Sequence, residues 1–356
     1  MRAATLDSVA ERQGPQVCVR PPGWVGQDAA AAFEGLLTWA ERAEALGLDG
    51  VFVGDRMLPQ AATRQGTVYG ATMLDAGVAL AAIAARTSRI RLGPLVLVLP
   101  FRHPLQLAKL TASLDVVSNG RLILGVGTGW NPPEFEALGI PRAERAARFE
   151  ESLRILRELW AGGSSSAESF WSFADVTLAP LPVQPGGPPV WMASFSPGSA
   201  LDWVEHVPPA LLPVLDRIGR LADGWVPLIY SASHHRRLDP VVLGAAWRHV
   251  LAAAAAAGRA RRELDFVLSD WVYVLDGTGA IDRCQEALAP FFRGDWADAR
   301  RTYNIGTEEE IAGQIFEMTR YVDRVDGYVL TPLSDEMDQL EALAESVAPR
   351  LRAGRI

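Results

Sequence analysis

Residues 90–127 decide the fold. Residues 90–99 read IRLGPLVLVL and residues 121–127 read RLILGVG, and the helical spacing of residues 105–117 separates the two runs. Neither run alternates between apolar and polar residues, which is typical of strands buried on both faces of a parallel sheet. A strand, a helix and a second strand in this order predict an α/β fold.

The same rhythm continues on both sides of this unit. Further strands are expected at residues 17–19, 50–55, 190–193, 224–226, 264–275 and 327–330. Further helices are expected at residues 29–46, 73–85, 142–160 and 308–322, and around the alanine run 252–257. Eight strands with a helix after most of them predict a (β/α)8 TIM barrel with insertions. A doubly wound open sheet is the alternative.

We expect one domain over residues 1–356 with two interruptions. The segment at about 161–189 is rich in Gly, Ser and Pro and is expected to form a lid excursion between a helix and the next strand. Pro208, Pro209 and Pro213 interrupt a helical pattern, which predicts an insertion at about 204–219.

Composition excludes several classes of protein. The net charge of −8 argues against nucleic acid as a main partner. The longest apolar stretch, residues 92–101, is much shorter than the roughly 20 residues of a membrane-spanning helix, and charged residues near the start argue against a signal peptide. Cys18 and Cys284 lie too far apart in sequence for a disulfide framework or a short metal motif, so we expect a cytoplasmic protein.

A glycine-rich stretch follows the strand at residues 121–126. Gly127 and Gly129 would let the backbone approach a ligand, and Thr128 and Asn131 add hydrogen-bonding groups. An ordinary tight turn is the alternative. The third glycine of a dinucleotide-binding fingerprint is missing.

A hydroxyl-rich turn follows the strand at residues 190–193. Ser194, Ser196 and Ser199 stand at the expected start of a helix, where hydroxyls and free N–H groups can bind phosphate. N-capping is the alternative. Lys109 is the only lysine in the chain, so a phosphate would have to be held by hydroxyls, backbone N–H groups or arginine.

One histidine and three tryptophans lie in loops that a barrel would place near a site. His103 is the best proton carrier near neutral pH, with a structural loop histidine as the alternative. Trp24 and Trp130 are expected to line a substrate pocket, and Trp171 is expected in the lid or in a small satellite core. The sequence contains no metal-ligand spacing, nucleophile elbow or Walker loop.

The sequence resembles the bacterial luciferase-like flavin-dependent oxidoreductases. The resemblance lies in residues 47–55, 74–160, 178–191, 221–225, 306–309 and 327–330. It implies one TIM barrel that binds reduced FMN, or the deazaflavin coenzyme F420, at the carboxyl ends of its strands.

The resemblance also implies roles for individual residues. A bulge after the third strand, often with a non-prolyl cis peptide, would place Val98 and Leu99 under the flavin ring. Thr128 and Asn131 would reach the ribityl chain or the ring edge, and the serine turn would take the phosphate. Relatives commonly pair through barrel helices, so a homodimer is expected.

One departure concerns proton transfer. Many relatives carry a histidine directly after the equivalent of Asp55, whereas this chain has Arg56. A guanidinium stabilises an anion but does not shuttle protons. The candidate catalytic residues are therefore His103, Arg56 and Asp55.

Three functional hypotheses follow. The first is a monooxygenase that uses O₂ and reduced FMN, delivered by a separate flavin reductase, to oxygenate a small organic substrate. The second is an F420-dependent reductase or dehydrogenase on the same fold. The third is a non-catalytic flavin-binding protein, motivated by Arg56 and the altered serine turn.

Overall fold

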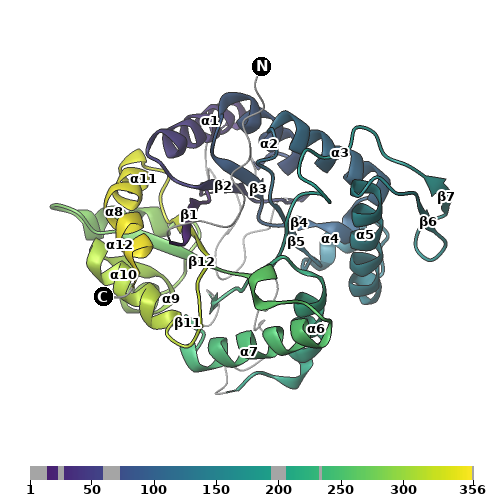
Figure 1. The fold of residues 1–356 in the computed structure, drawn as a ribbon. Coiled ribbons are helices and arrows are strands. Elements are labelled where there is room, and N and C mark those ends of the chain that lie inside the picture. Colours follow the sequence, from purple (N-terminus) through teal and green to yellow (C-terminus); the bar gives the residue numbers. More distant parts are fainter. Residues whose placement is uncertain (1–13, 23–27, 59–72, 194–205, 232–234, 355–356) are drawn as a thin grey trace.

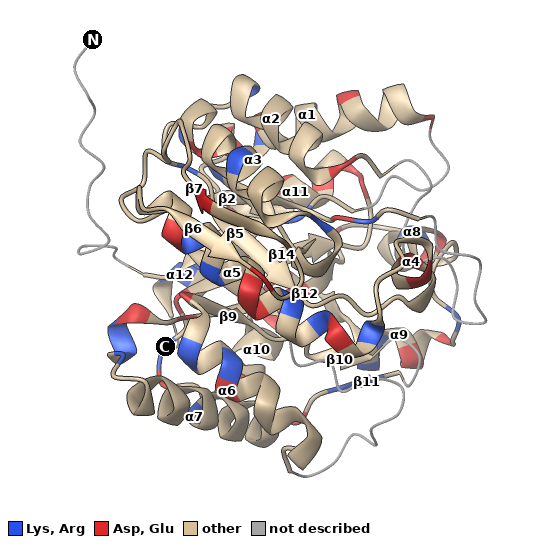
Figure 2. Cartoon of the chain, turned by 90° about the vertical axis from the view of Figure 1, so that its right-hand side faces the viewer, with Lys and Arg blue, Asp and Glu red and all other residues tan. Residues whose placement is uncertain are grey.

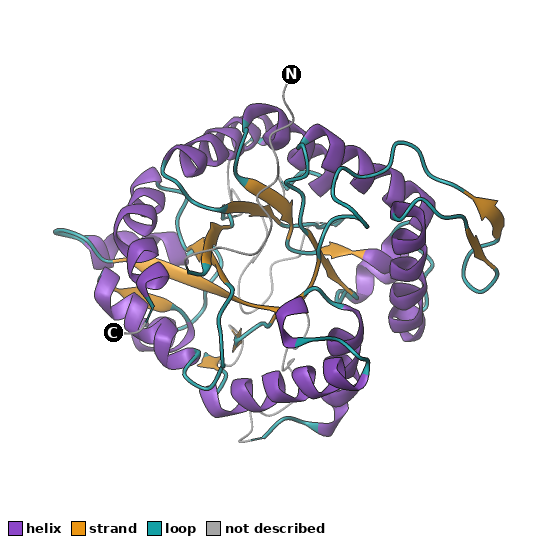
Figure 3. Cartoon of the chain, viewed as in Figure 1, coloured by secondary structure: helices purple, strands orange, loops and turns teal. Residues whose placement is uncertain are grey.

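The computed structural model describes residues 14–22, 28–58, 73–193, 206–231 and 235–354. Its central feature is a ring of parallel strands surrounded by helices (Figures 1 and 3). The barrel strands are β1 (Gln16–Val19), β2 (Gly50–Val53), β3 (Arg91–Pro94), β4 (Leu97–Val98), β5 (Leu124–Gly127), β8 (Val190–Ala193), β9 (Gly224–Val226), β12 (Asp265–Val274) and β14 (Gly327–Pro332).

The strand order is β3-β2-β1-β14-β12-β9-β8-β5-β4, and every neighbouring pair is parallel. A parallel bridge between Leu92 and Leu122 joins β3 to the segment that enters β5, which brings the ends of the sheet together. Because β3 and β4 are successive halves of one strand, the ring has eight strand positions. The predicted (β/α)8 barrel is confirmed, and the open sheet is not formed.

Helices cover the outside of the ring. They are α1 (Ala29–Ala45), α2 (Ala76–Arg86), α3 (Pro104–Val117), α4 (Pro132–Ala137), α5 (Arg145–Trp160), α6 (Leu212–Leu221), α7 (Pro240–Ala256), α8 (Ala280–Leu288), α9 (Trp296–Thr302), α10 (Glu308–Met318), α11 (Met337–Ala342) and α12 (Ala348–Ala353). Asp28, Asp75 and Thr307 begin three of them by accepting hydrogen bonds from backbone N–H groups of the first turn. None of the helices in the described ranges is long and apolar enough to cross a bilayer.

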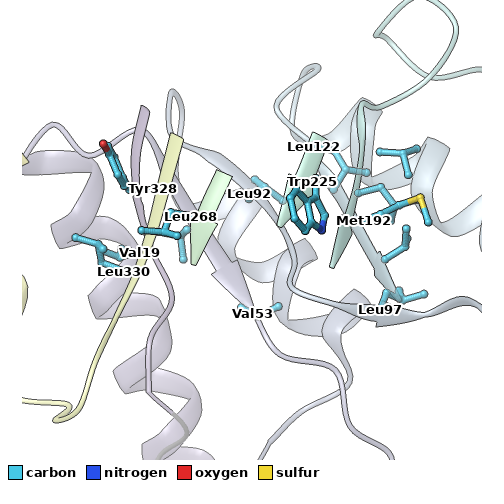
Figure 4. Packing of buried hydrophobic residues seen from close by; sticks show 14 of the residues in the cluster. Val19, Val53, Leu92, Leu97, Leu122, Met192, Trp225, Leu268, Tyr328 and Leu330 are labelled. Atoms are coloured by element: carbon cyan, nitrogen blue, oxygen red, sulfur yellow. The ribbon is translucent and has the colours of Figure 1, made fainter. Parts of the chain in front are cut away.

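Buried apolar side chains form three clusters, and two of these form the layers on either side of the barrel sheet. The larger layer lies between strands and helices and includes Leu92, Met192 and Trp225 (Figure 4). The smaller layer fills the inside of the ring and includes Phe52, Trp191 and side chains from six other strand regions. Charged side chains lie mostly on the helices and loops outside the sheet (Figure 2). This division explains why the strands lack polar alternation.

The segment expected as a lid lies beside the barrel. Its antiparallel strands β6 (Ser165–Ala167) and β7 (Phe173–Val176) stand at the outer edge of the molecule, beyond α5 (Figure 1). Ser165 Oγ donates to Glu158 on α5 at 2.6 Å, and Lys109 Nζ on α3 donates to the Ala179 carbonyl at 2.5 Å. These bonds attach the excursion to the outer helices rather than over the mouth of the ring.

The segment expected as an insertion contains a regular barrel helix. Residues 212–219 belong to α6, which lies between β8 and β9 and buries Leu215 and Ile218. Pro209 and Pro213 stand in the first turns of the 3₁₀ helix Pro209–Leu211 and of α6. A proline is tolerated there because the first turn needs no N–H donor, so these prolines begin the helix instead of interrupting it.

Two further pairings were not expected from sequence. Strand β13 (Asn304–Gly306) pairs with the outer half of β12, off the ring. Strands β10 (Tyr230–Ser231) and β11 (Arg236–Arg237) form a small antiparallel pair after β9. All are two or three residues long, too short to show periodicity.

A glycine pair tests the closure of the ring. A Cβ atom on Gly125 would overlap the carbonyl oxygen of Pro94, whereas a Cβ on Gly313 in α10 would meet nothing. We expect Gly125→Ala to lower the free energy of unfolding by about 1–3 kcal/mol or more. Gly313→Ala should raise it by about 0.5–1 kcal/mol. Urea denaturation measures both, and a neutral Gly125→Ala variant would contradict the close backbone approach.

Glu44 gives a pH-dependent prediction at the opposite end of the barrel. Partial burial acts to raise its pKa, but hydrogen bonds from the N–H groups of Ile90, Arg89 and Ser88 and from the Ser88 hydroxyl lower it to about 2. Its contribution to stability is therefore complete above about pH 4.5 and is lost as the pH falls toward 2.

We expect Glu44→Gln to lower the free energy of unfolding by about 1 kcal/mol at pH 7, because solvent screens this partly exposed group. The difference from the native chain should disappear as the pH falls from 4.5 toward 2. Glu41→Gln on the same helix removes only an exposed pair with Arg86 and serves as the control. An equal effect of Glu44→Gln at pH 2 and pH 7 would refute the assignment.

Candidate active site

The carboxyl ends of the parallel strands meet at one mouth of the ring, where function collects in such barrels. Arg20 follows β1, Asp55 follows β2, and Thr128 follows β5. The bulge between β3 and β4 also reaches this mouth. The residues at these strand ends form the candidate site.

The third strand is broken where the resemblance predicts a bulge. A non-prolyl cis peptide joins Leu95 to Val96, between β3 and β4. Leu95 belongs to the layer inside the ring, and Val96 packs against the same layer. Successive residues of a regular strand point to opposite faces, so two inward neighbours mark a break in the pleat. The expected continuous strand at residues 90–99 is thus two short strands.

This break builds an apolar floor at the mouth. A Cβ atom on Gly127 would lie only 2.9 Å from Val96 Cγ2, so glycine at this position lets the Val96 side chain pack directly against the β5 backbone. The cis peptide lies upstream of the pair expected under the ring. Val98 lines the adjoining cavity, whereas Leu99 is fully buried in the outer core and offers no surface to a ligand.

An ion pair holds this bulge in place. The Asp55 carboxylate, 6% exposed, accepts from both terminal nitrogens of Arg102 at 2.7 and 2.8 Å. It also accepts from the Val98 N–H at 3.4 Å. Burial opposes the charge of Arg102, but the hydrogen bonds and charges of Asp55 and Asp75 outweigh it and raise the pKa of Arg102. Asp55 therefore fixes β2 against the bulge, and its oxygens are occupied.

Arg56 lies beside this pair and faces an aromatic ring. Its Nε donates to the Leu58 carbonyl at 2.9 Å, and its guanidinium carbon lies 5.2 Å from the centroid of Trp130. Trp130 is 56% exposed, so the stacked pair borders solvent. A permanently charged group in this position can stabilise an anion at the mouth.

Glu134 on α4 fixes the same loop and was not singled out in the sequence. Its buried carboxylate accepts from the N–H groups of Met57 and Leu58 at 3.0 and 3.1 Å. A cavity of about 260 Å³ lies among these groups. It is lined by Asp55, Arg56, Met57, Met73, Asp75, Val98, Phe101, Arg102 and Glu134.

The glycine-rich stretch brings free polar groups next to the floor. Gly129 has φ +78°, and a Cβ there would lie 2.8 Å from Val98 Cγ1, so both conformation and space require glycine. Thr128 and Asn131 are partly buried, and their side chains form no hydrogen bond to another described residue. These groups can bind the polar edge of a ligand.

His103 and Trp171 lie apart from this cavity. His103 is exposed, and its Nδ1 accepts from the Leu105 N–H at 3.3 Å at the start of α3. Its ring lies 6.2 Å from Trp171 and 6.1 Å from Phe173, on the excursion. Trp171 and Phe173 pack against the outer core, which matches the satellite-core alternative. The structure thus brings Asp55 and Arg56 together but separates His103 from them.

Four expected site residues lie outside the described residues: Trp24, Ser194, Ser196 and Ser199. Within the described ranges no group of three or more His, Cys, Asp or Glu side chains could hold a metal ion. The remaining groups at the mouth are backbone, hydroxyl, amide and arginine, a donor set that suits an anionic, hydrogen-bonding organic cofactor.

The Asp55–Arg102 pair gives a prediction with a matched control. We expect Asp55→Asn to lower the free energy of unfolding by about 3 kcal/mol, because it leaves a largely buried guanidinium without its main partner. Asp75→Asn removes a 3.2 Å contact to the same arginine from a side chain that is 54% exposed, and should cost less than about 1 kcal/mol. Equal effects of the two substitutions in urea denaturation would contradict this difference.

Comparisons with known proteins identify the family of the chain. A family model described as luciferase-like monooxygenase matches residues 16–315. The F420-dependent glucose-6-phosphate dehydrogenase of Amycolatopsis mediterranei is 30% identical over 303 residues, which cover 74% of this chain and 89% of that protein. The oxygenase component of the trigonelline monooxygenase of Acinetobacter baylyi is 36% identical over 122 residues, only 34% of each chain.

A solved structure extends the likeness to the whole fold. The monooxygenase RslO1 from Streptomyces bottropensis superposes with a TM-score of 0.75 and 27% identity. The match covers 94% of this chain and 99% of that one.

Proposed function

Because the chain belongs to the luciferase-like monooxygenase family, we propose that it is a flavin-dependent monooxygenase. In this proposal it uses O₂ and reduced FMN, delivered by a separate flavin reductase, to oxygenate a small organic substrate. The observation that carries the proposal is the apolar floor formed by the broken third strand. There, Val96 packs against the backbone of Gly127.

The residues present fit a flavin. A flat ring needs an apolar surface on one face and hydrogen-bonding groups at its edge. Val96 and Gly127 supply the surface, and Thr128 and Asn131 supply side chains that are not engaged with other described residues. Ser194, Ser196 and Ser199 are proposed to hold the phosphate after β8. When bound, reduced flavin supplies the electrons that activate O₂.

The described part of the cavity offers no unengaged base, which favours oxygen chemistry over dehydrogenation. Dehydrogenation of an alcohol needs a base within hydrogen-bond reach of the substrate hydroxyl. Among the described lining residues, Asp55 and Asp75 contact Arg102, Glu134 accepts from two backbone N–H groups, and the arginines stay charged. Arg56 is proposed to stabilise negative charge beside the ring.

F420-dependent hydride transfer is the second candidate function. It is favoured by the 30% identity to the dehydrogenase of Amycolatopsis mediterranei, which extends over 74% of this chain. On that reading the same floor would carry the deazaflavin ring, and the cavity beside Arg56 would take the substrate.

A titration distinguishes the two cofactors. We expect the purified protein to bind reduced FMN at least about tenfold more tightly than reduced F420 under anaerobic conditions, a difference of about 1.4 kcal/mol. Substrate conversion with a flavin reductase and NADH should then require O₂. Unchanged anaerobic turnover with F420 would refute the monooxygenase proposal.

A variant of the floor serves as an internal control. Gly127→Val should weaken reduced FMN binding by at least about tenfold, because the new side chain would displace Val96 and disturb the floor. Circular dichroism reports whether the barrel remains folded. FMN binding without product from any substrate in a reductase-coupled screen would favour the non-catalytic hypothesis.

A further inference from the structure

Arg20 stands at the mouth of the ring, directly after β1, and has no acidic partner among the described residues. Its Nε donates to the Thr331 hydroxyl at 3.1 Å, and its backbone N–H donates to the Leu330 carbonyl at 3.0 Å. The side chain is partly buried. A partly buried guanidinium normally forms hydrogen bonds with a carboxylate or with other acceptors. The N–H donors on its terminal nitrogens are therefore candidates for binding a ligand.

The nearby carboxylate of β12 is already committed. Asp270 is fully buried, accepts from both terminal nitrogens of Arg237, and accepts from Asn304 Nδ2 at 2.6 Å. The sequences at residues 23–27 and 59–72, which follow β1 and β2, contain no Asp or Glu. The described residues therefore place a positive charge at the mouth without pairing a carboxylate with it.

An aromatic group holds this charge against one side of the mouth. The guanidinium carbon lies 5.1 Å from the ring centroid of Trp271 on β12. Trp271 is itself fixed, because its Nε1 donates to the Tyr230 hydroxyl at 2.5 Å and its ring packs 5.9 Å from Phe291. Nε bonds to Thr331 and one face lies on Trp271, and the terminal nitrogens form no hydrogen bond to another described residue, so we assign them to a ligand. Two such nitrogens match the two oxygens of a carboxylate.

The position of β1 separates this charge from the proposed cofactor phosphate. Along the ring, β1 is four strand positions from β8 in both directions, counting β3 and β4 as one. The two strand ends therefore face each other across the mouth. A phosphate held by the turn after β8 would leave Arg20 for the other ligand of the site.

We propose that Arg20 recognises the substrate and that the substrate is a carboxylate on an apolar body. The carboxylate would bind the terminal nitrogens of Arg20, and the apolar body would extend from Trp271 toward the bound flavin. This substrate class rests on the proposed function, since it presumes that the flavin occupies the floor beside Gly127.

Calorimetry with a matched pair of probes tests the proposal. We use 2-naphthoate and its neutral analogue 2-naphthamide, which differ in charge but little in shape. The native chain should bind the carboxylate at least about tenfold more tightly than the amide, because only the anion forms charge-assisted hydrogen bonds. Arg20→Gln should remove this preference, and Arg20→Lys should retain part of it, since lysine offers a point charge without the planar fork.

Arg236→Gln is the matched control. It removes the same charge from an exposed side chain of β11 and should leave the preference unchanged. Equal binding of the two probes to the native chain would overturn the proposal, as would a preference that survives in Arg20→Gln. Thermal denaturation verifies that the Arg20 variants remain folded.

A parallel titration with reduced FMN separates this proposal from the proposed function. Arg20→Gln should leave the affinity for FMN within about twofold. If the variant binds FMN tenfold more weakly while naphthoate binding is unchanged, Arg20 serves the cofactor phosphate and the proposal is overturned. If the native chain binds no flavin but shows an Arg20-dependent preference for naphthoate, the anion site stands and the proposed function fails.

Discussion

This barrel closes where the backbone of the third strand lies against the backbone of the fourth, and glycines on both strands allow this close contact. Gly93 and Gly125 face carbonyl oxygens of the neighbouring strand at a distance that no Cβ atom could occupy. Here Leu92 also exchanges backbone hydrogen bonds with Arg121 and Ile123, at 3.2 and 2.9 Å. Directly after this tight contact the third strand breaks, and the break turns Val96 toward the mouth. The floor of the site is thus a consequence of how the ring is closed.

Most charges around the site hold loops and are not available for chemistry. Asp55 and Arg102 tie the end of β2 to the bulge, and Glu134 anchors the next residues of the same loop. Because both carboxylates are engaged in this way, the described groups at the mouth that can contact a ligand are hydroxyls, an amide and guanidinium groups. Such a site is suited to orienting a cofactor that carries its own reactivity.

The sequence predicted the barrel because buried parallel strands have a strong signal. The apolar runs at residues 51–53 and 327–330 became β2 and the first part of β14. A break in the third strand was expected only from resemblance and without an exact position, because an apolar run contains no sign of where its pleat changes. The Asp55–Arg102 pair joins residues that are 47 positions apart and has no local pattern. Sequence left Trp171 in either a lid or a satellite core, because aromatic composition does not reveal which surface a loop packs against.

The single lysine makes the reactivity of this protein toward amine reagents unusually simple. Lys109 is exposed on α3, and its ammonium group is bonded to the Ala179 carbonyl of the excursion, on the outer side of the helix layer. An acylating dye or a surface-coupling ester therefore has one side-chain target, which lies outside the cavity beside Arg56. Modification of the one lysine side chain therefore leaves the residues that line this cavity chemically unchanged.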